Sequence, residues 1–167
     1  MAYDARAIAN YFLDLAKQKG VPLTPMKLQK LIYFAHGWRL GLNNEALIVD
    51  PIQAWQYGPV ISSVYQEFKH FGSGAITSNA SSFDFDKLEF VTPEVKLEDK
   101  ETRALLNRIW DVYGKYSAMK LSNLSHIPNG PWDKARKKSS VQNVVIDDEL
   151  IGEYFRSLVA KNKAEVA

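Results

Sequence analysis

Along most of this chain, apolar residues recur every three or four positions, the spacing of amphipathic α-helices. The first such stretch starts after Asp4, a good N-cap, and stops at Gly20, a residue favoured just beyond helix C-termini. A second helix is expected from Thr24-Pro25 to Gly41, with the proline in its first turn. The clearest periodicity covers residues 99–113. Further helix starts are expected at Pro59, Ser117, Pro131 and Asp147.

Two stretches instead predict extended chain. Residues 47–56 hold two short apolar runs broken by Asp50-Pro51, and residues 83–91 begin with alternating Phe and Asp, as on a strand with one wet face. Together the patterns predict about six helices and a minor β element. The expected fold class is therefore mainly α (α+β), a compact helical bundle with small extended elements near residues 47–56 and 83–91.

The run Gln53–Val60, QAWQYGPV, places two large aromatic residues beside a Gly-Pro pair. Proline restricts the preceding residue to extended conformations and suits the first turn of a helix. A strand over residues 52–55 is therefore expected to turn sharply into a helix at Pro59, with Trp55 and Tyr57 at the corner. Two aromatic side chains at a rigid corner can anchor a core or a recognition surface, and the sequence leaves both roles open.

Composition and charge narrow the function classes. With 167 residues and no low-complexity stretch, the chain is expected to form one domain. Its net charge of +2 is not that of a strongly basic nucleic-acid binder. The absence of cysteine excludes disulfides, thiolate metal sites and a cysteine nucleophile, and it fits a cytoplasmic location. No run of about 18 apolar residues occurs, so no membrane span is expected.

No catalytic or metal-binding pattern stands out among the polar residues. The three histidines, His36, His70 and His126, lack the i, i+4 spacing of a helical zinc site. His36 lies in an apolar helix and is expected to be a satisfied structural residue. His126 is expected at a helix C-terminus, where an imidazole interacts with the last carbonyl groups. The chain therefore predicts no metal and no cofactor, and its basic run at residues 134–138 predicts a solvated helix end.

Four segments form a specific combination: MKLQKLIYFAHGW at residues 26–38, AWQYGPV at 54–60, LSH at 124–126 and PWDKAR at 131–136. Tyr65, Ile146 and Tyr154-Phe155 accompany them. In this combination the chain resembles the Panacea domain, the SocA-like antitoxin family that includes phage-associated relatives. The resemblance implies a single domain over residues 1–167 with its core at about 5–157. Residues 74–97 match no part of the pattern and are expected to form a variable insertion.

The resemblance implies a mostly helical, non-enzymatic antitoxin that binds a cognate protein toxin and neutralises it by direct contact. It also implies a further partner, since one family member is regarded as an adaptor that delivers its toxin to a protease. The residues expected to bind the toxin lie in or beside the matching segments: Lys30, Trp55, Gln56, Tyr57, His126 and Trp132. For Trp55 and Trp132, a place in the core is an equally strong expectation.

Two other function classes remain open. A small-ligand-binding protein or an enzyme would need a pocket near Tyr57, His126 and Asp133, with a histidine of shifted pKa at its floor. A nucleic-acid accessory protein would bind phosphates through residues 134–138, and salt would weaken that binding steeply. The oligomeric state is also open, because amphipathic helices can bury a face within one chain or between chains.

Overall fold

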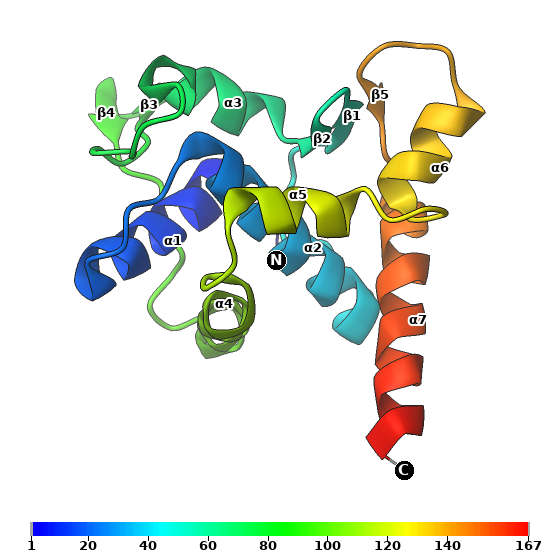
Figure 1. Cartoon of the computed structure of the whole chain (residues 1–167). Coiled ribbons are helices and arrows are strands. Elements are labelled where there is room, and N and C mark those ends of the chain that lie inside the picture. Colours follow the sequence, from blue (N-terminus) through cyan, green and yellow to red (C-terminus); the bar gives the residue numbers. More distant parts are fainter. Residues whose placement is uncertain (1, 167) are drawn as a thin grey trace.

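A computed structural model describes residues 2–166 of the chain, with side chains to residue 162. Helices dominate this range and the strands are few and short, which confirms the expected mainly α fold (Figure 1). The described chain has seven α-helices where about six were expected: α1 (Ala5–Lys19), α2 (Pro25–Asn43), α3 (Ser62–Phe68), α4 (Lys100–Tyr113), α5 (Ala118–Ser125), α6 (Pro131–Lys138) and α7 (Asp148–Val166). A short 3₁₀ turn, η1 (Lys69–Phe71), follows α3.

Most helix ends follow the local signals. The Asp4 carboxylate accepts the Arg6 backbone N–H at 2.8 Å, and Gly20 ends α1 in the left-handed conformation with a φ of 66°. The expected end of α2 at Gly41 is wrong, because α2 continues to Asn43. Gly41 instead allows α7 to approach, since a Cβ there would lie 2.7 Å from the Cβ of Phe155. A glycine required by packing was thus mistaken for a helix terminus.

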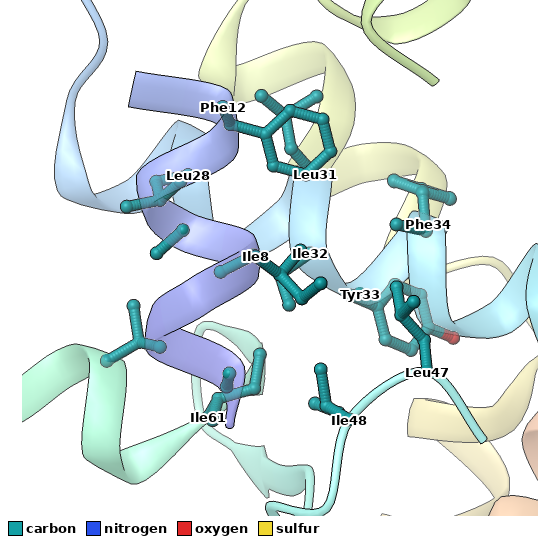
Figure 2. Close-up of a cluster of buried hydrophobic side chains, with 14 of the residues drawn as sticks. Ile8, Phe12, Leu28, Leu31, Ile32, Tyr33, Phe34, Leu47, Ile48 and Ile61 are labelled. Atoms are coloured by element: carbon teal, nitrogen blue, oxygen red, sulfur yellow. The ribbon is translucent and has the colours of Figure 1, made fainter. Parts of the chain in front are cut away.

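Helix α2 forms the centre of the molecule. It contacts α1, α3, α4, α5 and α7, and Figure 1 shows it crossing the middle of the fold. Because neighbours cover it on several sides, almost every residue from Leu28 to Leu40 is buried. Figure 2 shows part of this core, in which side chains of α1 and α2 meet side chains of the connecting segments. The labelled residues are Ile8 and Phe12 of α1, Leu28, Leu31, Ile32, Tyr33 and Phe34 of α2, and Leu47, Ile48 and Ile61 of the connecting segments.

His36, buried on α2, is the satisfied structural residue that was expected. Its Nδ1 accepts the backbone N–H groups of Leu47 and Ile48 at 3.2 and 3.4 Å. An N–H donor can only be received by an unprotonated ring nitrogen, so Nε2 carries the proton and donates it to Asp148 at 2.8 Å. The ring therefore ties the segment after α2 to the first turn of α7.

The largest difference from the sequence prediction lies around Pro59. Instead of a strand turning into a helix, β1 (Gln53–Trp55) and β2 (Gly58–Val60) form an antiparallel hairpin, with Gln56 and Tyr57 as its two-residue loop. Helix α3 begins only at Ser62. On its other edge β1 pairs with β5 (Val144–Val145), a long-range contact that propensity at Pro59 does not encode. The corner that was predicted for Trp55 and Tyr57 is therefore the end of a β-hairpin.

The expected extended element near residues 83–91 is confirmed as a second antiparallel hairpin. It consists of β3 (Ser82–Asp84) and β4 (Glu89–Val91), with Phe83 opposite Phe90. The other expected stretch, residues 47–56, contains β1 and, before it, a single parallel bridge between Ile48 and Tyr3. Extended pairing thus contributes little to the core, and both hairpins are attached to the helical body.

Candidate partner-binding site

The β1–β2 hairpin projects Gln56 and Tyr57 at its tip, and Tyr57 is 72% exposed. Gly58 follows the tip with a φ of 123°, a backbone conformation that residues other than glycine rarely adopt. Below it, the side-chain amide of Gln29 on α2 holds the end of β2. Gln29 donates to the carbonyl of Ile61 at 3.0 Å and accepts the N–H of the same residue at 2.9 Å. The exposed tip therefore stands on a fixed base.

Trp55 and Trp132 are half-buried and link the hairpin to its neighbours. The Trp55 ring lies 4.8 Å from the Tyr65 ring on α3, and its indole N–H donates to Gln53 at 2.9 Å. The Trp132 indole N–H on α6 donates to the carbonyl of Trp55 at 2.7 Å. Arg136 on the same helix donates to the carbonyl of Ala54 at 3.2 Å. Helix α6 thus holds β1 in place, and the two tryptophans have a structural role in the arrangement.

His126 packs against the β1–β2 hairpin and against Trp132 of α6. It caps the C-terminus of α5, and its Nδ1 donates to the carbonyl of Ser122, because a carbonyl can only accept. Its ring centre is 4.2 Å from that of Trp132, and its Cε1 would lie 3.0 Å from a Cβ placed on Gly58. The prediction that His126 sits at a helix C-terminus is confirmed, and the ring also packs against the hairpin.

Lys30 on α2 is the most unusual charged residue of this region. It is only 2% exposed, and its Nζ donates to the carbonyl of Pro59 at 3.2 Å. Among the described side chains it forms no ion pair. Burial without a counter-charge lowers its pKa from the usual 10.5 to about 8. A Cβ on Gly58 would lie 3.0 Å from this ammonium group, so the hairpin lies directly over it.

A cavity of about 320 Å³ opens beside the hairpin, between α2 and α3. Lys30, Trp55 and Tyr57 contribute to its wall together with mostly apolar residues: Pro25, Met26, Gln29, Val60, Val64, Tyr65, Phe68, Lys69 and Gly72. Its wall contains two lysines and no carboxylate. We call this cavity, together with the hairpin tip, the tip groove. Three of the six expected binding residues meet in it. His126 and Trp132 do not line it but pack on each other beside the hairpin, and Gln56 is exposed at the hairpin's end.

The residues invoked for the alternative functions are engaged elsewhere. Asp133 accepts the backbone N–H of Asn129 at 2.8 Å and pairs with Lys137 at 2.9 Å, and both interactions lower its pKa. The groove beside Tyr57 is lined by Lys30 and Trp55 rather than by His126 or Asp133. Of the basic run, Arg136 contacts β1 and Lys137 is paired within α6.

Two general features of the described chain bear on the site. Within residues 2–162, no three His, Asp or Glu side chains come together in a way that could hold a metal ion. In the same part of the chain, no helix has both the length and the apolar composition of a membrane span.

Sequence comparison identifies the family to which this arrangement belongs. The profile of the family described as "Antitoxin SocA-like, Panacea domain" matches residues 28–133, a range that contains all six expected binding residues. The chain belongs to this family. A curated relative, "Antitoxin SocA" of Caulobacter vibrioides (strain NA1000 / CB15N), is 35% identical over 131 residues, which cover 78% of this chain and 69% of the relative. No solved structure matches the chain. The resemblance drawn from the four segments is therefore confirmed.

Some residues of the site carried no sequence signal of their role. Gln29 lies among apolar residues of α2, where its polar side chain is the only indication that it binds buried backbone groups. Arg136 belongs to a basic run that was expected to be solvated, yet it reaches the β1 backbone. Neither contact could be predicted, because each depends on a hairpin in which one strand, β1, pairs with a segment about 90 residues away.

Proposed function

We propose that this chain is an antitoxin that binds a cognate protein toxin directly and neutralises it, using the tip groove as its main contact. Membership of the SocA-like family and the name of the relative support the antitoxin role. One observation supports the tip groove as the contact: Tyr57 is exposed at the end of a hairpin that Gln29 and Trp132 hold in place.

The energetics of binding favour such a tip. An exposed tyrosine offers a large apolar ring and a hydroxyl group while losing little side-chain entropy when bound. Interfaces typically derive most of their affinity from a few aromatic or arginine residues seated in pockets. Because the hairpin is anchored at its base, little backbone ordering opposes binding. The apolar groove next to Tyr57 can in turn receive a side chain of the toxin.

The buried Lys30 favours a toxin surface that carries a carboxylate. Its ammonium group has three donors, of which the Pro59 carbonyl uses one. A carboxylate brought next to the tip would offset the missing counter-charge, and a charge pair that forms in a water-poor site is strong. Lys30 and the apolar groove together therefore match an acidic residue flanked by apolar ones.

The decisive experiment expresses the neighbouring gene product with and without this chain. We expect toxicity that disappears on co-expression, and a complex that co-purifies. Tyr57→Asp should weaken the complex without lowering the melting temperature, because the side chain is exposed. Leu42→Asp, at the far end of α2 and also exposed, is the matched control and should leave binding intact. A harmless neighbour that forms no complex would refute the antitoxin proposal, and equal binding by both variants would refute the tip groove.

Neutralisation can proceed by covering the toxin or by delivering it to a protease, and the toxin's lifetime separates the two. We propose delivery as a step that follows binding, in line with what the family resemblance implies. A shorter half-life of the toxin in cells that express this chain, restored by Tyr57→Asp, is the expected result. A toxin that is inactive yet equally long-lived would leave coverage alone as the mechanism.

Binding of a small anionic ligand is a second candidate function, favoured by the two lysines and the absence of carboxylates in the tip groove. It predicts that the isolated chain is stabilised by a small carboxylate or phosphate and that Lys30→Met abolishes this stabilisation. An unchanged melting temperature across a panel of such anions would reject it.

A further inference from the structure

The β3–β4 hairpin carries an exposed apolar cluster at a distance from the tip groove. Phe83, Phe85 and Phe90 pack on one another, with ring centres 5.0 Å apart for Phe83 and Phe85 and 5.1 Å apart for Phe83 and Phe90. Even so, Phe85 is 80% exposed, and Phe90 and Leu88 are each 74% exposed. We call these four residues the Phe cluster. Monomeric proteins rarely leave several large apolar residues in contact on their surface unless the surface binds something.

The hairpin is held in a defined position by a buried amide. Asn10 on α1 accepts the N–H of Ala80 at 2.7 Å and donates to the carbonyl of Ala80 at 3.1 Å. The same side chain donates to the carbonyl of Pro93 at 2.9 Å, so one residue joins both ends of the segment that contains the hairpin. Next to this anchor, the N–H of Ser81 donates to the carboxylate of Glu67 on α3 at 3.0 Å. The Phe cluster thus projects from a fixed base.

The loop between the strands is also ordered by specific contacts. The carboxylate of Asp84 accepts the N–H groups of Asp86 and Lys87 at 2.9 and 3.1 Å. Leu88 has a φ of 54°, a left-handed conformation that is uncommon for a bulky residue. Backbone held in such a conformation is frequent at binding surfaces, where it fixes how side chains are displayed.

The charge around the cluster indicates the chemistry of a partner. Residues 83–90 contain three carboxylates and one lysine, so the phenylalanine rings are surrounded by net negative charge. An acidic rim is repelled by anionic lipid and nucleic-acid phosphates and is attracted to lysine and arginine. Figure 1 places this hairpin at the other end of α3 from the β1–β2 hairpin, so one large partner could reach both.

We propose that the Phe cluster is a second docking element, which inserts into an apolar pocket rimmed by lysine and arginine residues on the toxin. The proposal rests on the antitoxin function and adds the surface chemistry of its partner. The cluster lies within residues 74–97, the expected variable insertion, where a contact could select one toxin from others without altering the tip groove.

The test uses the full chain and the purified toxin. The double variant Phe85→Ser, Phe90→Ser is expected to weaken binding by at least about tenfold, as for residues at the centre of an interface. Its melting temperature should stay unchanged because both side chains are exposed. Met119→Ser and Val141→Ser change similarly exposed apolar residues outside the hairpin and serve as controls, with binding within about twofold of the unmodified chain.

A second variant tests the charge and does not depend on the stability of the cluster. Asp86→Lys with Glu89→Lys should slow association several-fold at low salt and flatten its salt dependence. Unchanged affinity and salt dependence in both hairpin variants, in a chain whose binding is still lost with Tyr57→Asp, would overturn this proposal and leave the antitoxin function standing. A chain that binds no toxin at all would overturn both. If the phenylalanine variant only converts a dimer into a monomer, the cluster joins two copies of this chain and the proposal is wrong.

Discussion

Replacing Lys30 with methionine is expected to make the protein more stable. The lysine is buried beneath the β1–β2 hairpin without a counter-charge among the described side chains, and burial lowers its pKa from 10.5 to about 8. At pH 7 the group is therefore charged in a surrounding that disfavours the charge. A pKa difference of this size corresponds to about 3 kcal/mol of lost stability. Methionine has a similar length and no charge, so Lys30→Met removes this penalty.

The gain is reduced by one lost hydrogen bond. The carbonyl of Pro59 accepts from Lys30 and would lose this partner, which costs about 1 kcal/mol. The net expectation is a free energy of unfolding higher by about 2 kcal/mol at pH 7. For a chain of 167 residues this corresponds to a melting temperature higher by about 6 °C.

The pH dependence gives the sharper test. Because the folded-state pKa of Lys30 is lowered, the unfolded chain binds more protons between about pH 8 and 10.5, and wild-type stability rises with pH across that window. The advantage of Lys30→Met should therefore be full below pH 8 and shrink as the pH rises. Buried tyrosines with raised pKa values, such as Tyr113, titrate in the alkaline range too, but they do so in both proteins. Comparing the two proteins at each pH isolates the lysine.

Urea denaturation of both proteins at pH 7, 8, 9 and 10 measures this difference directly. A variant that is less stable than the wild type at pH 7, or a stability difference that does not change with pH, would refute the reasoning. Loss of toxin binding in the more stable variant would show that the charge is kept for recognition, since residues that lower stability are often retained for function.

Three further substitutions test the contacts that α2 makes with its neighbours and those that α6 makes with β1. Gly37→Ala should lower stability by about 1–3 kcal/mol in urea denaturation, because its Cβ would lie 2.1 Å from Cε2 of Phe155, and Phe155→Leu in the same chain should recover part of that loss. His36→Leu removes the acceptor of two buried N–H groups at residues 47–48 and should lower stability by about 2–4 kcal/mol; a change below 0.5 kcal/mol would contradict the contact. Trp132→Phe deletes the donor to the β1 backbone and should reduce the melting temperature by about 3 °C in calorimetry.

The helices could be predicted because their signals are local. Asp4, Thr24 and Ser117 each accept a backbone N–H within three residues, so the few residues around each cap are sufficient to mark a start. The prediction for Gly41 is wrong because glycine occurs both at helix ends and where two helices pack closely. Only the position of Phe155 on α7 shows that the second reason applies to Gly41. Local sequence therefore predicts where helices begin better than which faces meet.

The hairpin at the candidate site was missed for a related reason. Proline is compatible with the first turn of a helix and also with a place in a short strand. At Pro59 the strand is stabilised by pairing with Ala54 and by the hydrogen bonds between Gln29 and Ile61. The motif residues could be selected from the sequence, and Tyr57 is exposed at the tip. The burial of Lys30 could not be predicted, because its cover comes from a hairpin some 28 residues later in the chain.

The two hairpins share a mode of support that argues for a common purpose. Each is held by the side-chain amide of a buried residue on a core helix, Gln29 on α2 for one and Asn10 on α1 for the other, and each amide both donates to and accepts from the backbone of the segment it holds. Burying an amide is favourable only when its hydrogen bonds are satisfied, and this requirement fixes the hairpin relative to the core. Exposed aromatic residues on both hairpins are thereby presented on rigid supports, as recognition surfaces require. If only one hairpin were held by a buried amide, a single contact with a partner would be the simpler inference. Because both hairpins, at the two ends of α3, are held in this way, we infer two contacts.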